Sequence, residues 1–175
     1  WSAPVAAMVS GDGGYFSWLE LGHNEDGWFL AGRNVWQGSS HLMFCATSTN
    51  GTDWATASIG GNRAWSDPDL SLSADVAAIA ADPYYDDYIR VWRHQGGSWT
   101  TQDVARAAEG GRTVRLGNDG RGNWSIFRQV DNNAGWLWSR FASSDDGWTW
   151  AGPRALPNPA VANASDSFTV EQAVN

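Results

Sequence analysis

Short apolar segments recur along the chain and are separated by glycine, asparagine and aspartate. Within many of them apolar and polar residues alternate, which is the two-residue period of a β-strand. The strands that this pattern predicts most clearly are 27–33, 41–47, 76–81, 88–93, 122–128 and 136–142. Only 104–109 has a helical pattern, and it is too short for a stable helix, so a loop or one helical turn is expected there. The sequence therefore predicts an all-β fold.

One turn between these strands has a distinctive sequence, Ser-x-Asp-x-Gly-x-Thr-Trp. Its fixed positions are Ser143, Asp145, Gly147, Thr149 and Trp150. Ser and Asp side chains bind nearby backbone amides in a tight hairpin, and glycine supplies the positive φ of the turn. The pattern resembles the Asp-box, or BNR repeat, of sialidase-like β-propellers, where this hairpin joins the two outer strands of a blade. In that family the box is structural and lies away from the catalytic face.

Weaker copies of the motif recur along the chain. Residues 47–54 keep Gly51 and Trp54, with threonine in the Ser and Asp places, and residues 92–99 keep Gly96 and Trp99. A Trp-x-x-Pro sequence like that after the box also opens the chain. The anchors Trp1, Trp54, Trp99 and Trp150 are 53, 45 and 51 residues apart. Such spacing fits a four-stranded propeller blade, which takes about 40–50 residues.

Together these features predict a single all-β domain over 1–175, a β-propeller of four-stranded antiparallel blades. The approximate blades are 8–60, 70–105 and 112–156, with an outer strand at 1–7 and a further strand at 165–175. About three and a half blades do not close a ring, because known propellers have about four to eight. The chain is then either a fragment that lacks further blades or one that completes its ring as a homo-oligomer. A β-fold other than a propeller is the third interpretation, and Trp65-Ser66-Asp67-Pro68, a Trp-x-x-Pro out of phase with the others, leaves the second repeat's register open.

Charge and composition narrow the functional classes. The net charge is −8 and there is no lysine, which argues against a nucleic-acid partner and fits an extracellular or surface protein. No apolar run approaches the roughly 20 residues of a membrane span. Cys45 is the only cysteine, so no intrachain disulfide can form, and its apolar neighbours predict a buried thiol. The chain begins at Trp1 without a signal peptide, so we expect a processed, trimmed or partial sequence.

The resemblance also implies where catalytic residues would be sought. Sialidase-like glycosidases clamp a substrate carboxylate with arginines from different blades, and they use a tyrosine nucleophile and an aspartate acid/base. The weak catalytic candidates in this chain are Arg33, Arg128, Tyr85 and Asp86. Arg90 is a weak ligand-binding candidate, since guanidinium groups bind carboxylates with two hydrogen bonds. The alternatives are strand-end arginines paired with surface aspartates, and a polar loop over 82–88.

Tryptophan is the remaining functional signal, with 13 residues in the chain. Exposed indole rings stack on the C–H faces of sugars, whereas propeller blades also pack through large apolar residues. Tryptophans that the box register does not explain are weak candidates for ligand binding: Trp18, Trp36, Trp65 and Trp136. No cofactor is predicted. No zinc-ligand spacing is present, and residues 118–123 form either a calcium-type loop or a glycine-rich turn.

From the sequence we expect a secreted or surface β-propeller that recognises carbohydrate or mediates adhesion without catalysis. Its partners would be glycans, with no nucleic acid and no membrane span. One alternative is part of a sialidase-like glycoside hydrolase whose catalytic residues lie mostly outside these residues. The other is a purely structural repeat module.

Overall fold

The computed structural model describes residues 14–36, 40–61, 63–83, 88–105, 111–131, 136–143 and 149–155. Within these ranges the regular elements are all β-strands, twelve in number, which form three antiparallel sheets of four strands each. The all-β fold and the four-stranded antiparallel sheets expected from the sequence are confirmed. Nowhere in the described part of the chain does a helix have the length and apolar character needed to cross a membrane.

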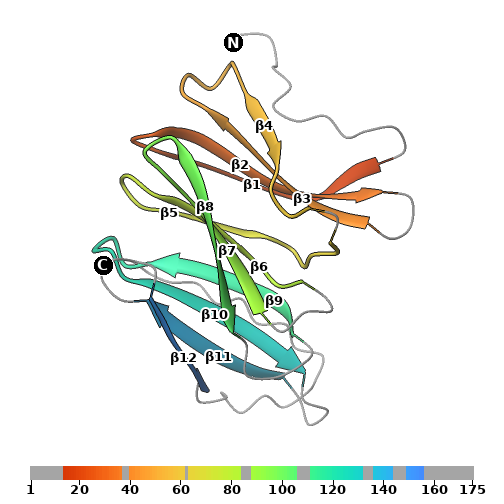
Figure 1. The fold of residues 1–175 in the computed structure, drawn as a ribbon, viewed down its shortest axis with the longest axis vertical. Coiled ribbons are helices and arrows are strands. Elements are labelled where there is room, and N and C mark those ends of the chain that lie inside the picture. The colour runs from red at the N-terminus through yellow and green to blue at the C-terminus, as the bar shows by residue number, and fades with distance from the viewer. Residues whose placement is uncertain are drawn as a thin grey trace.

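Each sheet is a meander in which every strand pairs with the next one along the chain (Figure 1). The first sheet contains β1 (Gly14–Asn24), β2 (Gly27–Trp36), β3 (Ser40–Ser48) and β4 (Ala55–Ser58). The second sheet contains β5 (Asp69–Leu72), β6 (Ala77–Ala81), β7 (Tyr88–Gln95) and β8 (Ser98–Ala105). The third sheet contains β9 (Gly111–Asn118), β10 (Trp124–Asp131), β11 (Trp136–Ser143) and β12 (Trp150–Ala155).

Glycine-rich turns make these meanders possible. The hairpin between β7 and β8 closes with Gln95 opposite Ser98, and only Gly96 and Gly97 lie between them. Both glycines have positive φ, 57° and 79°, which is the conformation that a two-residue turn needs to match the twist of its strands. The local sequence therefore determines where this hairpin turns.

The first strands of the three sheets lie side by side, with β5 between β1 and β9. Acidic side chains on one strand bind the backbone of the next. The carboxylate of Glu20 on β1 accepts a hydrogen bond from the amide of Leu70 on β5. The carboxylate of Asp69 on β5 accepts one from the amide of Leu116 on β9, at 2.5 Å. The sheets are thus joined by polar contacts as well as by apolar packing.

Two apolar layers fill the space between the sheets. The layer between the first and second sheets includes Met43, Cys45, Trp65, Ile79 and Trp92. The layer between the second and third sheets includes Ala78, Val91, Val104, Leu116 and Ile126. Strand β6 contributes to both layers, and all five of its residues are buried because its sheet is covered on both faces. Each fully buried Ile or Val side chain contributes about 1.5–3 kcal/mol.

Residues 65–67 connect the sheets at the end away from these hairpins. The hydroxyl of Ser66 accepts a hydrogen bond from the amide of Asp82 at 2.9 Å, and the Ser66 amide donates to the Asp82 carbonyl at 2.8 Å. Asp67 forms a parallel bridge with Thr113 at the start of the third sheet. The out-of-phase Trp-x-x-Pro sequence at these positions therefore belongs to the connection between β4 and β5, not to a box hairpin.

Two sequence expectations concern the ends of the described ranges. The loop or helical turn expected over 104–109 is wrong for Val104 and Ala105, which end β8 as extended residues. Val104 is buried in the layer facing the third sheet, and this packing outweighs the local helical pattern. Residues 106–110 lie outside the described residues, as do the strands expected at 1–7 and 165–175.

Candidate functional site

A cavity of about 360 Å³ opens between the hairpin ends of the first and second sheets. Residues from the β1–β2 turn, from β2, from the β3–β4 hairpin and from β7 line it. Among them are Asp26, Trp28, Phe29, Thr47, Asp53 and His94. The volume lies in the range of small-molecule sites, about 300–1,000 Å³. The lining combines aromatic surface with carboxylate and hydroxyl oxygens, which suits a ligand that is partly apolar and rich in polar groups.

Trp28 forms the aromatic part of the cavity. It follows Gly27 at the start of β2, and 36% of the residue is exposed to solvent. The His23 ring lies 4.6 Å from the Trp28 ring, centroid to centroid, at an interplanar angle of 54°. A Cβ added to Gly51, whose φ is +73°, would lie 3.3 Å from the indole Nε1, so a bare glycine sits against the ring. The indole is held in place while more than a third of it stays accessible.

His94 is a largely buried polar residue of the cavity wall. Only 9% of it is exposed, and its ring packs against Phe29 at 5.0 Å and Trp99 at 5.2 Å between centroids. Its Nδ1 lies 3.8 Å from an Asp26 carboxylate oxygen and has no hydrogen-bond partner within the described structure. Burial lowers the pKa of His94, and the Asp26 carboxylate partly opposes this effect. The imidazole is therefore neutral at neutral pH.

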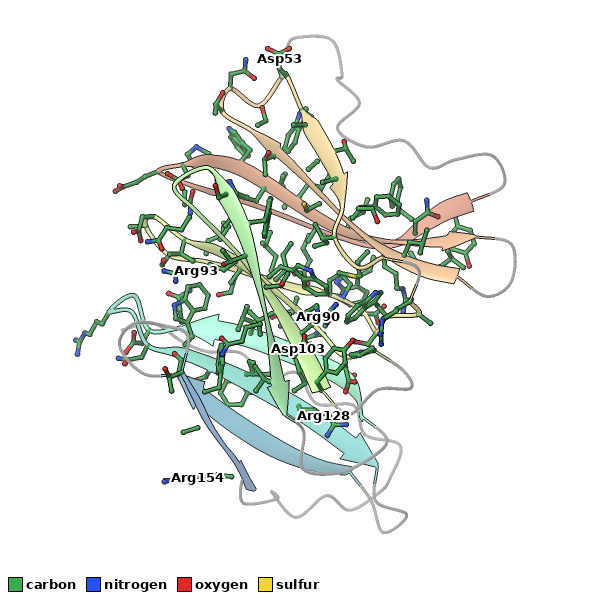
Figure 2. The ribbon with its side chains drawn as sticks, viewed as in Figure 1. Asp53, Arg90, Arg93, Asp103, Arg128 and Arg154 are labelled. Atoms are coloured by element: carbon green, nitrogen blue, oxygen red, sulfur yellow. The ribbon has the colours of Figure 1, made fainter. Side chains whose placement is uncertain are left out.

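The β3–β4 hairpin forms the rim of the cavity. The hydroxyl of Ser48 accepts a hydrogen bond from the Gly51 amide at 2.9 Å, and the Asn50 side-chain oxygen accepts one from the Asp53 amide at 2.8 Å. The Asn50 amide group also holds the Asp53 carboxylate at 2.8 Å. Figure 2 shows Asp53 at the tip of the hairpin. The sequence predicts a weak box copy at this hairpin. The side chains that bind its backbone are Ser48 and Asn50, one place after the two threonines expected to replace Ser and Asp.

The other residues of the expected boxes make different contacts from one copy to the next. In the best copy, the Ser143 hydroxyl accepts a hydrogen bond from the Trp124 amide at 2.9 Å, and Trp150 packs partly buried against the layer facing the second sheet. Thr149 is exposed, while Asp145 and Gly147 lie outside the described residues. Trp54 donates from its indole to the Gly51 carbonyl at 3.2 Å. Trp99 packs against the layer between the first and second sheets.

The candidate arginines are each engaged by a different carboxylate. Arg33 lies 2.9 Å from Asp67, and Arg128 lies 2.9 Å from Asp82 with both side chains almost fully buried. Arg90 and Asp103, adjacent in Figure 2, form two hydrogen bonds of 2.6 and 2.8 Å. A clamp for a ligand carboxylate would need these guanidinium groups to converge on a shared open space. The expected surface pairing applies to Arg90, whereas the Arg128 pair is internal.

The remaining candidates are distributed over the structure. Trp65 is fully buried, and it contacts Arg33 through its carbonyl at 3.5 Å and Arg90 through its ring at 5.7 Å, so its ring is not open to a ligand. Trp36 and Trp136 lie on β2 and β11, and their side chains lie outside the described residues, as do Tyr85 and Asp86 entirely. In the loop 118–123, the Asp119 carboxylate accepts hydrogen bonds from within its own turn.

Trp18 belongs to a second polar cluster, where the first strands meet. Its indole donates to the Glu20 carboxylate at 3.0 Å, and the Arg115 guanidinium lies 5.6 Å above its ring. Arg115 also lies 3.5 Å from the Asp69 carboxylate. Burial, and to a lesser extent Glu20, raise the pKa of Asp69 from 3.8 to about 7, against the opposing effects of the Leu116 amide and Arg115. The carboxyl group of Asp69 is thus half protonated near neutral pH, which is the state that acid/base catalysis uses.

The cavity residues were not candidates in the sequence. Asp26 and Trp28 belong to the Asp-Gly turn and first residues of a strand, a pattern that only predicts a hairpin. His94 falls within a weak box copy and shows no motif of its own. The residues meet because the meander brings the β1–β2, β3–β4 and β7–β8 turns to the same end of the stack.

Comparison with known proteins adds no assignment. The chain matches no model of a known protein family, and a search of curated proteins finds no match for it.

Proposed function

We propose that the three sheets are blades of a sialidase-like Asp-box β-propeller and that the chain recognises carbohydrate without cleaving it. Three consecutive four-stranded meanders whose first strands lie together support the blade interpretation. The turn glycines Gly51 and Gly96 with positive φ, and the Ser143 bonds to the backbone of β10, support the box hairpins. We place such a protein outside the cell or on a cell or virion surface.

The observation that carries the binding proposal is the cavity beside Trp28. An accessible indole next to carboxylate and hydroxyl oxygens matches a sugar, whose ring has an apolar C–H face and hydroxyl groups around its edge. The carboxylates of Asp26 and Asp53 can accept hydrogen bonds from those hydroxyl groups. His94 and Phe29 close the inner wall, so the site is concave rather than a flat aromatic patch.

Non-catalytic binding is favoured by the arrangement of the arginines. Each of Arg33, Arg90 and Arg128 is already paired with a carboxylate, which a substrate carboxylate would have to displace in order to bind there. One observation favours the glycoside hydrolase alternative, namely the raised pKa of Asp69 beside Glu20. That pair also bonds the backbone of neighbouring strands, a structural role that catalysis does not require.

A glycan array followed by calorimetric titration tests the proposal. We expect the wild-type chain to bind at least one glycan, and Trp28→Ala to weaken binding about tenfold or more, since buried aromatic contacts dominate most interfaces. Tyr15→Ala is the matched control, because Tyr15 is 62% exposed at the opposite end of β1. Circular dichroism melts confirm that both variants fold.

Two outcomes contradict the proposal. Binding that survives Trp28→Ala unchanged rules out this cavity as the site, and a wild-type chain that binds no glycan leaves the structural module as the better account. Turnover of a fluorogenic glycoside by the wild-type chain that is abolished in Asp69→Asn would instead establish the hydrolase alternative.

A further inference from the structure

The charges around the cavity restrict which sugar it accepts. Two carboxylates line it, Asp26 from the β1–β2 turn and Asp53 from the β3–β4 hairpin, and no arginine is among its described lining residues. His94, the third ionisable group of the lining, is held neutral at neutral pH by burial. The cavity therefore has a negative charge that no lining residue balances.

His94 and Asp26 both line the cavity, and they are not hydrogen-bonded to each other. The distance of 3.8 Å between His94 Nδ1 and Asp26 Oδ2 is too long for a hydrogen bond. The His94 nitrogen is buried and lacks a hydrogen-bond partner within the described structure, although leaving a buried polar atom unsatisfied costs about 1–3 kcal/mol. With the ring proton on Nε2, both atoms are acceptors. A ligand group that carries several N–H donors satisfies both of them at once.

The exposed ring of Trp28 adds a second requirement. An indole face attracts cations and packs against apolar C–H groups. In the same cavity it lies beside the two carboxylates. A ligand that combines a positive charge with a flat ring face suits all these groups, whereas an acidic sugar would bring its carboxylate toward Asp26 and Asp53.

We propose that the cavity selects sugars with a free amino group, the ammonium of a hexosamine lying between Asp26 and His94 with the sugar ring against Trp28. This inference rests on the proposed carbohydrate recognition and specifies its ligand class. Asp53 attracts the same charge from the rim. Sialic acids and uronic acids are excluded by repulsion from the same two carboxylates.

Three probes of similar size test the inference by calorimetry. They are a tetrasaccharide of glucosamine, its fully N-acetylated form, and a sialylated tetrasaccharide. The titrations are run at about pH 6, where a large part of the sugar amine is protonated. We expect the free-amine form to bind about tenfold more tightly than the N-acetylated form, and the sialylated probe to bind weakest.

Two carboxamide variants locate the effect. Asp26→Asn should lower the affinity for the free-amine probe about tenfold and reduce the preference over the N-acetylated form. Glu25→Gln is the control, because Glu25 is exposed one residue earlier in the same turn and does not line the cavity. It removes the same charge and should change the affinity less than about twofold.

The outcomes distinguish failure of the selection for amino sugars from failure of carbohydrate recognition itself. If the N-acetylated or sialylated probe binds as tightly as the free-amine form, the selection for amino sugars is wrong while carbohydrate recognition stands. Equal losses in Asp26→Asn and Glu25→Gln would also overturn it, because general surface charge would then account for the attraction. If no probe binds and no glycan of the array binds, carbohydrate recognition itself fails.

Discussion

Asp69 is expected to make the stability of the protein depend on pH, and Asp69→Asn should remove that dependence. The side chain lies between β1 and β9 with 13% of its surface exposed, and the Leu116 amide donates to it. An asparagine oxygen accepts the same hydrogen bond and carries no charge. The variant therefore removes the ionisation of residue 69 while it keeps this contact with the third sheet.

The magnitude follows from the pKa of Asp69, which burial and Glu20 raise from 3.8 to about 7. A folded-state pKa above the unfolded value means that the folded state binds the proton more tightly. The resulting stabilisation is full below about pH 4 and is lost as the pH rises to about 7. At about 1.4 kcal/mol per unit, the total is about 4 kcal/mol, of which about 3 kcal/mol disappears between about pH 5 and pH 8.

Urea unfolding followed by tryptophan fluorescence measures the free energy of unfolding across this range. For the wild type we expect it to fall by about 3 kcal/mol more than for Asp69→Asn between about pH 5 and pH 8, so the variant becomes the more stable protein at the higher pH. Asp75→Asn is the control, since Asp75 is exposed in the β5–β6 turn. Glu20→Gln should lower the Asp69 pKa and shift the wild-type fall to lower pH.

A constant difference between the wild type and Asp69→Asn across that range would refute the reasoning. It would mean that the Asp69 carboxylate is ionised throughout, because Arg115 and the Leu116 amide together outweigh burial and Glu20. The same result would remove the observation that favours a catalytic role for the Glu20–Asp69 pair.

Three further predictions follow from single contacts. Arg128→Met removes the guanidinium group from the buried Asp82 carboxylate, so the free energy of unfolding in urea should fall by about 3–5 kcal/mol. Adding Asp82→Asn to this variant should restore part of the loss. A double variant whose loss equals the sum of the two single losses would contradict this. Burial raises the pKa of the Cys45 thiol to about 11, so native protein should resist a thiol reagent that labels it fully in urea, and immediate native labelling would contradict this. Gly51→Ala should cost about 1 kcal/mol more than Gly96→Ala, because both turns have positive φ but only the first glycine lies against an indole; equal losses would show that the indole contact is unimportant.

The alternation of residues predicted several strands because their turns are encoded locally. The segments 27–33 and 136–142 lie within β2 and β11, and the segment 76–81 covers β6 with one residue before it. Strand β5 was harder to predict, since it has only four residues and begins with Asp69, an acidic residue that is normally found in turns. The carboxylate of Asp69 accepts a hydrogen bond from the amide of Leu116 on β9, and this contact explains an acidic residue in β5. The two residues are 47 positions apart in the sequence.

The ion-pair partners of the arginines also could not be predicted from the local sequence. Arg33, Arg90 and Arg128 looked equally suited to bind a ligand, because the sequence gives only their residue type and strand position. Their partners lie 34, 13 and 46 residues away in the chain. Strand pairing within the second sheet places Asp103 opposite Arg90. The partners of Arg33 and Arg128 are brought to them only by the stacking of the sheets. The candidate site was missed for the same reason, since its residues come from three separate hairpins.

Arg128 and His94 are both polar residues in the core-facing phase of a strand, and their hydrogen-bond partners distinguish them. Apolar residues mark the core-facing phase of a strand, so a polar residue in that phase must find a partner or leave a buried atom unsatisfied. Arg128 shares its phase with Ile126 and is paired with a buried carboxylate, which makes it structural. His94 shares its phase with Trp92, yet its Nδ1 has no hydrogen bond within the described structure and lies at an open cavity. A polar residue at a core-facing strand position is therefore a candidate for ligand binding when the described structure supplies no hydrogen-bond partner for it. His94 meets that condition.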